Sequence, residues 1–107
     1  MSIERIEDQE RLGELLQTDT VIVYKHSPRC SISRRTIVQM EEFAEQQPDI
    51  PVAMIDVVAQ RELSDFVAKE LKIRHKSPQA IIVRDGEVVW ETSHFSIRAK
   101  VLSERLG

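Results

Sequence analysis

The chain has 107 residues, of which 41% are apolar and 31% are charged, and its formal net charge is −3. This length suits one domain that buries its core without disulfides or metal. The acidic balance argues against a nucleic-acid partner. No apolar run approaches the ~20 residues of a membrane helix, and the first residues lack the apolar stretch of a signal peptide. We therefore expect a single domain over residues 1–107, in the cytoplasm and without a membrane partner.

Apolar periodicity predicts the elements in chain order. Helical spacing predicts helices over 8–17 and 31–46, a third carrying Leu63, Phe66, Val67 and Leu71, and a fourth carrying Ile97, Val101, Leu102 and Leu106 behind Ser96 as its N-cap. Short β-rich runs predict strands at Val21–Tyr24, Val52–Ile55, Gln79–Val83 and Glu87–Glu91. Between the last two strands, Asp85-Gly86 is typical of a two-residue hairpin turn, in which both positions need positive φ.

This order, α-β-α-β-α-β-β-α, restricts the topology. A strand–helix–strand unit has a right-handed crossover and makes parallel strands, whereas the hairpin adds an antiparallel pair. The compact solution is a mixed four-stranded sheet with helices on both faces. The sequence therefore predicts an α/β fold of the thioredoxin-like architecture.

Cys30 is the single cysteine, so the chain forms no internal disulfide. It follows a predicted buried strand and begins a predicted helix, whose N-terminus favours an anion. Residues 25–40 contain no Asp or Glu but five basic or histidine side chains: Lys25, His26, Arg29, Arg34 and Arg35. We expect a thiolate with a pKa below the free value of about 8.5, which is the nucleophile in disulfide exchange. The alternative is a buried apolar cysteine, for which these polar neighbours are a poor lining.

Other candidates surround this cysteine. Ser33 completes a Cys-x-x-Ser pattern and can donate a hydrogen bond to sulfur, although by itself it reads more simply as a solvated helix serine. Ser77-Pro78 precedes a strand; about 5–6% of such bonds are cis, but the place in the fold favours a cis bond here. His26 either tunes the thiolate or is a surface-loop histidine. The three histidines lack metal-ligand spacing, so no metal site is predicted.

Four segments together resemble the monothiol bacilliredoxin family, the C-type oxidoreductases of the bacillithiol system. They are Val21–Arg35, Ser77-Pro78-Gln79, Asp85-Gly86 and Ser93-His94-Phe95. The resemblance covers nearly the whole chain and implies a thioredoxin-like fold that reduces mixed disulfides between client proteins and bacillithiol. Bacillithiol is then the small-thiol co-substrate, and no cofactor is tightly bound. Cys30 resembles the family's nucleophile, Ser33 fills the position of an absent resolving cysteine, and Pro78 matches its cis-proline.

The active-site loop departs from the family pattern, which usually reads Thr-Cys-Pro-Ile-Ser. Here Ser31 follows Cys30 and restores a free N–H, whereas the lost proline would have pre-organised the first helical residue. Arg29 adds a positive charge before the cysteine. We expect nucleophilic attack to survive this change. Because bacillithiol carries malyl carboxylates, Arg29, Arg34 and Lys25 are candidates for binding an anionic thiol, with Arg35 a weaker one.

Two alternative functions remain open from the sequence. The first is an iron–sulfur cluster carrier like the Cys-Gly-Phe-Ser glutaredoxins, which one cysteine per chain permits. Ser31-Ile32 does not resemble the Gly-Phe of that motif. The second is a non-enzymatic binding module that uses the fold as a surface, for which Cys30 would react slowly with disulfides.

Overall fold

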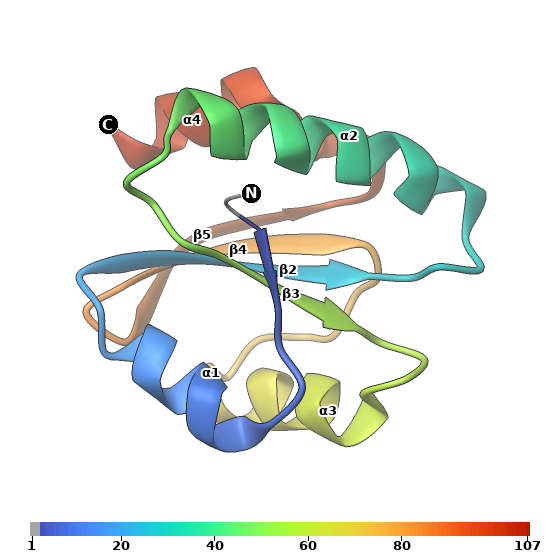
Figure 1. Cartoon of the computed structure of the whole chain (residues 1–107), viewed down its shortest axis with the longest axis vertical. Coiled ribbons are helices and arrows are strands. Elements are labelled where there is room, and N and C mark those ends of the chain that lie inside the picture. The colour runs from blue at the N-terminus through green and yellow to red at the C-terminus, as the bar shows by residue number, and fades with distance from the viewer. Residues whose placement is uncertain (1–2) are drawn as a thin grey trace.

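The computed structural model describes residues 3–107. Its elements are β1 (Ile3–Arg5), α1 (Gln9–Leu16), β2 (Thr20–His26), α2 (Ser31–Gln46), β3 (Val52–Asp56), α3 (Arg61–Glu70), β4 (Gln79–Arg84), β5 (Glu87–Ser93), the short 3-10 turn η1 (His94–Ser96) and α4 (Ala99–Leu106). They pack in three layers, with α1 and α3 on one face of the sheet and α2 and α4 on the other (Figure 1). The predicted α/β layers are therefore confirmed.

The sheet has five strands in the order β1-β3-β2-β4-β5, so the prediction of four strands is wrong. The additional strand, β1, pairs parallel with β3, with Ile3 opposite Val52 and Arg5 opposite Met54. β1 has only three residues, two of them charged, so the sequence contains no apolar run there that would predict a strand. Ladder hydrogen bonds to β3 hold this strand instead, and the bond from Ile6 N to Met54 O (2.9 Å) continues them.

β2 is the central strand, parallel to β3 and antiparallel to β4. Its side chains alternate between two apolar clusters because strand residues point to opposite faces in turn. Val21 and Val23 pack toward α1 and α3, whereas Ile22 and Tyr24 pack toward α2 and α4. A central strand covered on both faces explains the near-continuous apolar run in the sequence.

The last helix begins later than predicted, and Ser96 is not its N-cap. Ser96 ends η1, and Arg98 is the N-cap of α4. The buried residue Ile97 is extended between the two, with φ −75° and ψ 103°. Gln39 of α2 supplies the cap from outside the helix, because its Oε1 accepts a hydrogen bond from Ala99 N at 2.9 Å. The hydrogen bond from α2, rather than the local sequence, thus determines where α4 begins.

The other boundaries follow the sequence closely. α2 spans the predicted residues, and Asp8 caps α1 through a 2.8 Å hydrogen bond from Arg11 N to its carboxylate. Asp85 (φ 54°) and Gly86 (φ 80°) both adopt the positive φ expected of the hairpin turn. Within the described residues, no helix is long and apolar enough to cross a membrane.

Candidate active site

Cys30 lies where the chain leaves β2 and enters α2. The segment 27–30 forms a tight turn, closed by a 3.0 Å hydrogen bond from Cys30 N to Ser27 O; Pro28 occupies its second position, where proline is favoured. Cys30 is the N-cap of α2, with an extended backbone (φ −96°, ψ 125°) and no hydrogen bond from its side chain to the helix. The cysteine is half-buried and belongs to neither apolar cluster. Cys30 therefore lies at the positive end of the helix dipole, with part of the residue exposed to solvent.

Ser33 is not the solvated helix serine that its pattern alone favours. Its side chain is buried, with 1% of the residue exposed, and its Oγ accepts a hydrogen bond from Ser27 N at 3.2 Å. This bond ties the first turn of α2 to the start of the active-site turn. Ser33 therefore fixes the loop that carries Cys30, a role that neither sequence interpretation of this residue contained.

A buried polar network that the sequence did not reveal lies beneath the first turns of α2. The Tyr24 hydroxyl is 2.7 Å from Thr36 Oγ1 and 3.0 Å from His26 Nδ1. Burial raises the pKa of Tyr24 to about 12, although the hydrogen bond with Thr36 opposes part of this shift. A tyrosine directly after the aliphatic run Val21–Val23 is the sequence signal for the network, because a buried tyrosine hydroxyl needs a partner.

His26 is the last residue of β2 and is half-buried rather than placed in a surface loop. Burial lowers its pKa, and the facing Asp56 carboxylate partly opposes this effect, whereas Arg5 adds to it. Its carbonyl accepts a 3.0 Å hydrogen bond from Val57 N of the segment after β3. His26 is thus held by both Tyr24 and the chain beyond β3.

The Ser77-Pro78 peptide bond is cis. The antiparallel register pairs Lys25 with Gln79, so Pro78 lies beside the end of β2 from which the Cys30 turn departs. The Pro78 carbonyl accepts a 3.1 Å hydrogen bond from His94 N, and His94 has a positive φ of 56° that forms this corner. The cis-proline segment and η1 therefore form one rigid border of the site.

Gln79 holds this segment from within the sheet. The residue is fully buried, and its Nε2 donates to Arg74 O (3.1 Å) and to Glu91 Oε1 (3.0 Å). Its Oε1 accepts from Lys76 N at 3.3 Å. In contrast, Ser77 Oγ is buried with no hydrogen-bond partner among residues 3–107. Gln79 belongs to the Ser-Pro-Gln segment of the family resemblance, but no pattern in the sequence predicts this anchoring role.

Among the predicted cations, Arg29 and Arg34 are exposed at the cysteine end of α2, as is Ser31. Lys25 is elsewhere. It is fully buried, and its Nζ donates to Ser64 O (3.0 Å) and contacts His75 Nδ1 (2.9 Å) on the α3 side of the sheet. Tyr24 and Lys25 point to opposite faces because neighbouring strand residues alternate. The structure therefore does not bring Lys25 together with Cys30.

Burial lowers the pKa of Lys25 to about 8, and the Asp65 carboxylate opposes part of this shift. The ammonium group thus belongs to a buried cluster beneath the sheet rather than to the cysteine face. No group of three or more His, Cys, Asp or Glu side chains in the described part of the chain is placed to hold a metal ion.

A half-buried cysteine at a helix start, bordered by a cis-proline on a mixed sheet, is the arrangement of thioredoxin-fold oxidoreductases. The family model of monothiol bacilliredoxin BrxC matches residues 1–102. The chain therefore belongs to the monothiol bacilliredoxin BrxC family, which confirms the resemblance seen in the sequence.

Solved structures agree with this fold. A thioredoxin-fold protein to which oxidoreductase activity has been ascribed is 28% identical, with a TM-score of 0.92 over 99% of this chain and 95% of that one. Thioredoxin from Trypanosoma brucei brucei is 19% identical, with a TM-score of 0.80 over 98% of this chain and 88% of its own. A thioredoxin point mutant from Halobacterium salinarum is 22% identical, with a TM-score of 0.79 over 96% and 86%. The two thioredoxins support the fold alone.

Proposed function

We propose that this chain removes bacillithiol from mixed disulfides on client proteins, with Cys30 as the nucleophile. The placement of Cys30 carries the proposal: the residue is the half-buried N-cap of α2, next to the cis-proline segment. Membership of the monothiol bacilliredoxin family supports bacillithiol as the small thiol. The positive end of the helix favours the thiolate, which is the reactive form of cysteine.

The reaction consists of two thiol–disulfide exchanges. In the first, the Cys30 thiolate attacks the bacillithiol sulfur of the mixed disulfide, a Cys30–bacillithiol disulfide forms, and the client leaves as a thiolate that takes up a proton. In the second, the thiolate of another bacillithiol molecule attacks the bound bacillithiol sulfur. Bacillithiol disulfide leaves and the Cys30 thiolate is regenerated. Overall, the client sulfur is reduced to a thiol, and the incoming bacillithiol is oxidised as it joins the bacillithiol taken from the client in one disulfide.

An external thiol must perform the second exchange, because the chain has one cysteine. Ser33 stands where a resolving cysteine would be, but its hydroxyl is not a thiol and already accepts a hydrogen bond from Ser27 N. Cys30 therefore forms one mixed disulfide, which persists until a small thiol from solution reduces it.

Exposed cations near Cys30 suit an anionic small thiol. Arg29 directly precedes the cysteine and Arg34 lies one helical turn beyond it, both exposed. Guanidinium groups bind carboxylates through paired hydrogen bonds, so these two arginines are assigned to the malyl carboxylates of bacillithiol. Lys25 has no part in this contact, since its ammonium group is buried on the α3 side.

On the opposite border, Ser77 and Pro78 are assigned to the client. The Ser77 hydroxyl itself is buried, so the client contact is assigned to the backbone of the cis-proline segment, which lies beside the end of β2 from which the Cys30 turn departs. The client would then be held with its mixed disulfide between this segment and Cys30.

The test is transfer of bacillithiol from a thiolated client to the protein, followed by intact mass spectrometry of both chains. The wild-type protein should gain one bacillithiol-sized adduct while the client loses it. The Cys30→Ser variant should remove none, and Ser31→Ala, which changes an exposed neighbour, should act as wild type. Removal of the adduct by Cys30→Ser would overturn the mechanism.

The identity of the small thiol has its own test. The wild-type protein is incubated separately with bacillithiol disulfide and with glutathione disulfide, and the mass added at Cys30 is recorded over time. We expect faster addition of bacillithiol, and Arg29→Gln with Arg34→Gln should reduce that preference. Equal or faster addition of glutathione would contradict the assignment to bacillithiol while leaving the exchange chemistry intact.

A further inference from the structure

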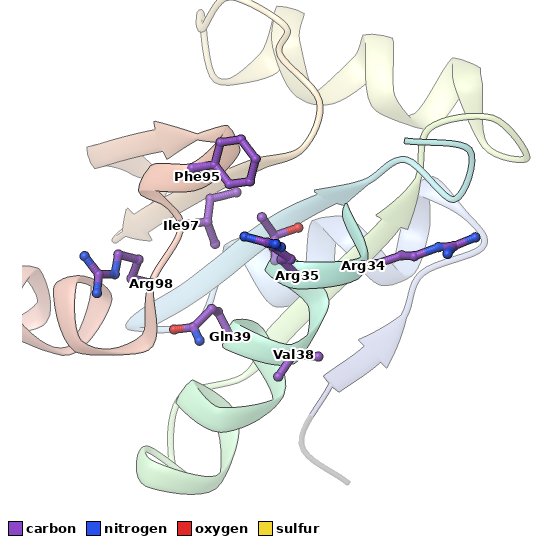
Figure 2. Close-up of a pocket in the computed structure, with 8 residues that line it drawn as sticks. Arg34, Arg35, Val38, Gln39, Phe95, Ile97 and Arg98 are labelled. Atoms are coloured by element: carbon purple, nitrogen blue, oxygen red, sulfur yellow. The ribbon is translucent and has the colours of Figure 1, made fainter. Parts of the chain in front are cut away.

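A groove runs between α2 and the segment that joins η1 to α4. It encloses about 420 Å³, within the size range of ligand pockets, roughly 300–1,000 Å³. Figure 2 shows that Arg35, Val38 and Gln39 line it from α2, whereas Phe95, Ile97 and Arg98 line it from the other side. Arg34 and Thr36 also line it, and of all these side chains only Arg34 has a part in the mechanism proposed above.

From this geometry we infer that the groove docks a segment of the thiolated client that combines acidic side chains with an apolar one. The inference rests on the proposed function, because it concerns the client of that same reaction. Three features of the groove point to such a segment: its exposed apolar surface, its positive charge without a paired carboxylate among residues 3–107, and its distance from Cys30.

The apolar surface is concentrated on two side chains. Phe95 is 61% exposed and Val38 is 55% exposed, and both are among the large hydrophobic residues that the fold leaves in solvent. The Arg35 guanidinium lies 5.9 Å from the centroid of the Phe95 ring, which places a cation over an aromatic face. Aromatic and arginine side chains are the types enriched where proteins bind one another. This pairing therefore suits an apolar side chain of a partner.

The charge of the groove is opposite to that of the whole chain. No Asp or Glu lines it, although the chain has a formal net charge of −3. Within residues 3–107, neither Arg35 nor Arg98 forms an ion pair with a carboxylate. Further along α2 the surface becomes mixed, since the adjoining hollow contains Glu42 and Glu104. The groove itself thus carries Arg35 and Arg98 without an acidic lining residue, and complements an acidic segment.

The position of the groove favours a polypeptide over the small thiol. At ~1.5 Å per residue, Val38 lies about 12 Å along α2 from Cys30, which about four extended residues would span. Arg34 also lines the groove, but its side chain points away from Phe95 (Figure 2). A small thiol bonded to Cys30 is therefore served by Arg29 and Arg34, whereas a client chain reaches onward to Arg35 and Phe95.

The walls of the groove are held before any partner binds. Gln39 Oε1 accepts from Ala99 N at 2.9 Å, which fixes α2 to the start of α4. On the other side, η1 is fixed to the cis-proline segment by the hydrogen bond from His94 N to Pro78 O. Binding to such a pre-organised surface avoids the entropic cost of ordering it.

Fluorescence anisotropy with a labelled peptide tests the inference. The probe is a fluorescein-tagged octapeptide with glutamates around one leucine, and serine where the client cysteine would be. We expect wild-type protein to bind it at low salt. Because exposed arginine–carboxylate pairs contribute modestly, Arg35→Gln with Arg98→Gln should raise the Kd about tenfold. Phe95→Ser should also weaken binding, and a peptide with lysines in place of the glutamates should not bind.

The matched control removes two positive charges from the opposite face of the sheet. Arg61→Gln with Lys69→Gln on α3 changes the net charge by the same amount, and this variant should bind the peptide as wild type does. Equal Kd values for the groove variant and wild type would overturn the inference, and so would equal weakening by the control. Displacement of the peptide by millimolar bacillithiol would also overturn it, because the groove would then be a small-thiol site.

The same peptide made with bacillithiolated cysteine separates this inference from the proposed function. The groove variant should show a raised KM with an unchanged kcat, because the groove does not touch the reacting sulfur. A Cys30→Ser protein should still bind the serine peptide with wild-type Kd. Absence of exchange by the wild-type protein, with its peptide binding intact, would contradict the proposed function alone. Wild-type exchange without groove-dependent binding would contradict this inference alone.

Discussion

The Tyr24 hydroxyl of strand β2 lies 2.7 Å from Oγ1 of Thr36 on helix α2. This contact joins the central strand to the helix that begins at Cys30, from inside the core. Both residues are buried, so each polar group depends on the other to replace water. The same hydroxyl reaches His26 Nδ1, which extends the link to the end of the strand.

Tyr24→Phe should therefore destabilise the protein by about 1 to 2 kcal/mol, because it removes the hydrogen bonds of the Tyr24 hydroxyl with Thr36 and His26. Urea denaturation of the wild type and variant measures the change. Thr36→Val is the companion variant, and the double variant should lose less than the sum of the two single losses. Strict additivity would show that the two hydroxyls do not depend on each other.

Ser33→Ala should slow, but not abolish, the reaction of Cys30. The change removes the acceptor for Ser27 N and loosens the turn, with a loss of about 1 kcal/mol of stability. We expect a few-fold slower reaction with a chromogenic disulfide, measured by stopped-flow absorbance. Ser31→Ala is the control and should react at the wild-type rate. A Ser33→Ala protein as inert as Cys30→Ser would mean that the Ser33 hydroxyl takes part in the chemistry.

Gln79→Met keeps the side-chain volume but removes the hydrogen bonds to Arg74 O and Glu91 Oε1. Because these bonds are buried, the variant should lose about 1 to 3 kcal/mol. The loop before Pro78 should exchange its amide hydrogens faster, while α1 should not. Hydrogen-exchange mass spectrometry measures both regions in one experiment. Unchanged protection around residues 74–78 would show that Gln79 does not hold this loop.

The fold could be predicted from the sequence wherever apolar periodicity was strong. The boundaries of α2 and the hairpin turn at Asp85-Gly86 followed from local pattern and turn chemistry. β1 could not be predicted, because its formation depends on pairing with β3 rather than on its own residues. The start of α4 depended on the Gln39 side chain, which lies 60 residues away in the sequence.

The position of the candidate site in the fold was predictable, but its interactions were not. The helix start at Cys30 followed from the sequence pattern, and the cis bond before Pro78 followed from its place in the fold and from the resemblance. The sequence grouped Lys25 with the cations of the site because it lies close to Cys30 along the chain. Its strand position instead turns the ammonium to the other face, toward Ser64 O. Likewise, no spacing pattern joins Ser33 Oγ to Ser27 N, since that bond exists only once the turn has formed.

The buried ammonium of Lys25 makes stability depend on pH. Its folded-state pKa is about 8, against an ordinary value of 10.5. Between these values the unfolded chain binds more protons than the folded one, so stability rises with pH. Below the folded pKa both states carry the charge, and the cost of burying it is fully present. Above the ordinary pKa both states are neutral, and that cost is absent.

Unfolding by urea at pH 8.0 and pH 9.5 tests this dependence, with Lys25→Met as the reference. Across this interval the wild type should gain about 1 to 2 kcal/mol relative to the variant. The interval stays below the range in which Tyr24 ionises, because the pKa of that phenol is raised to about 12. Lys25→Met also removes the hydrogen bond to Ser64 O, so the change with pH, rather than the offset at one pH, is diagnostic. Parallel pH profiles for the two proteins would show that the Lys25 ammonium is not desolvated in the folded state.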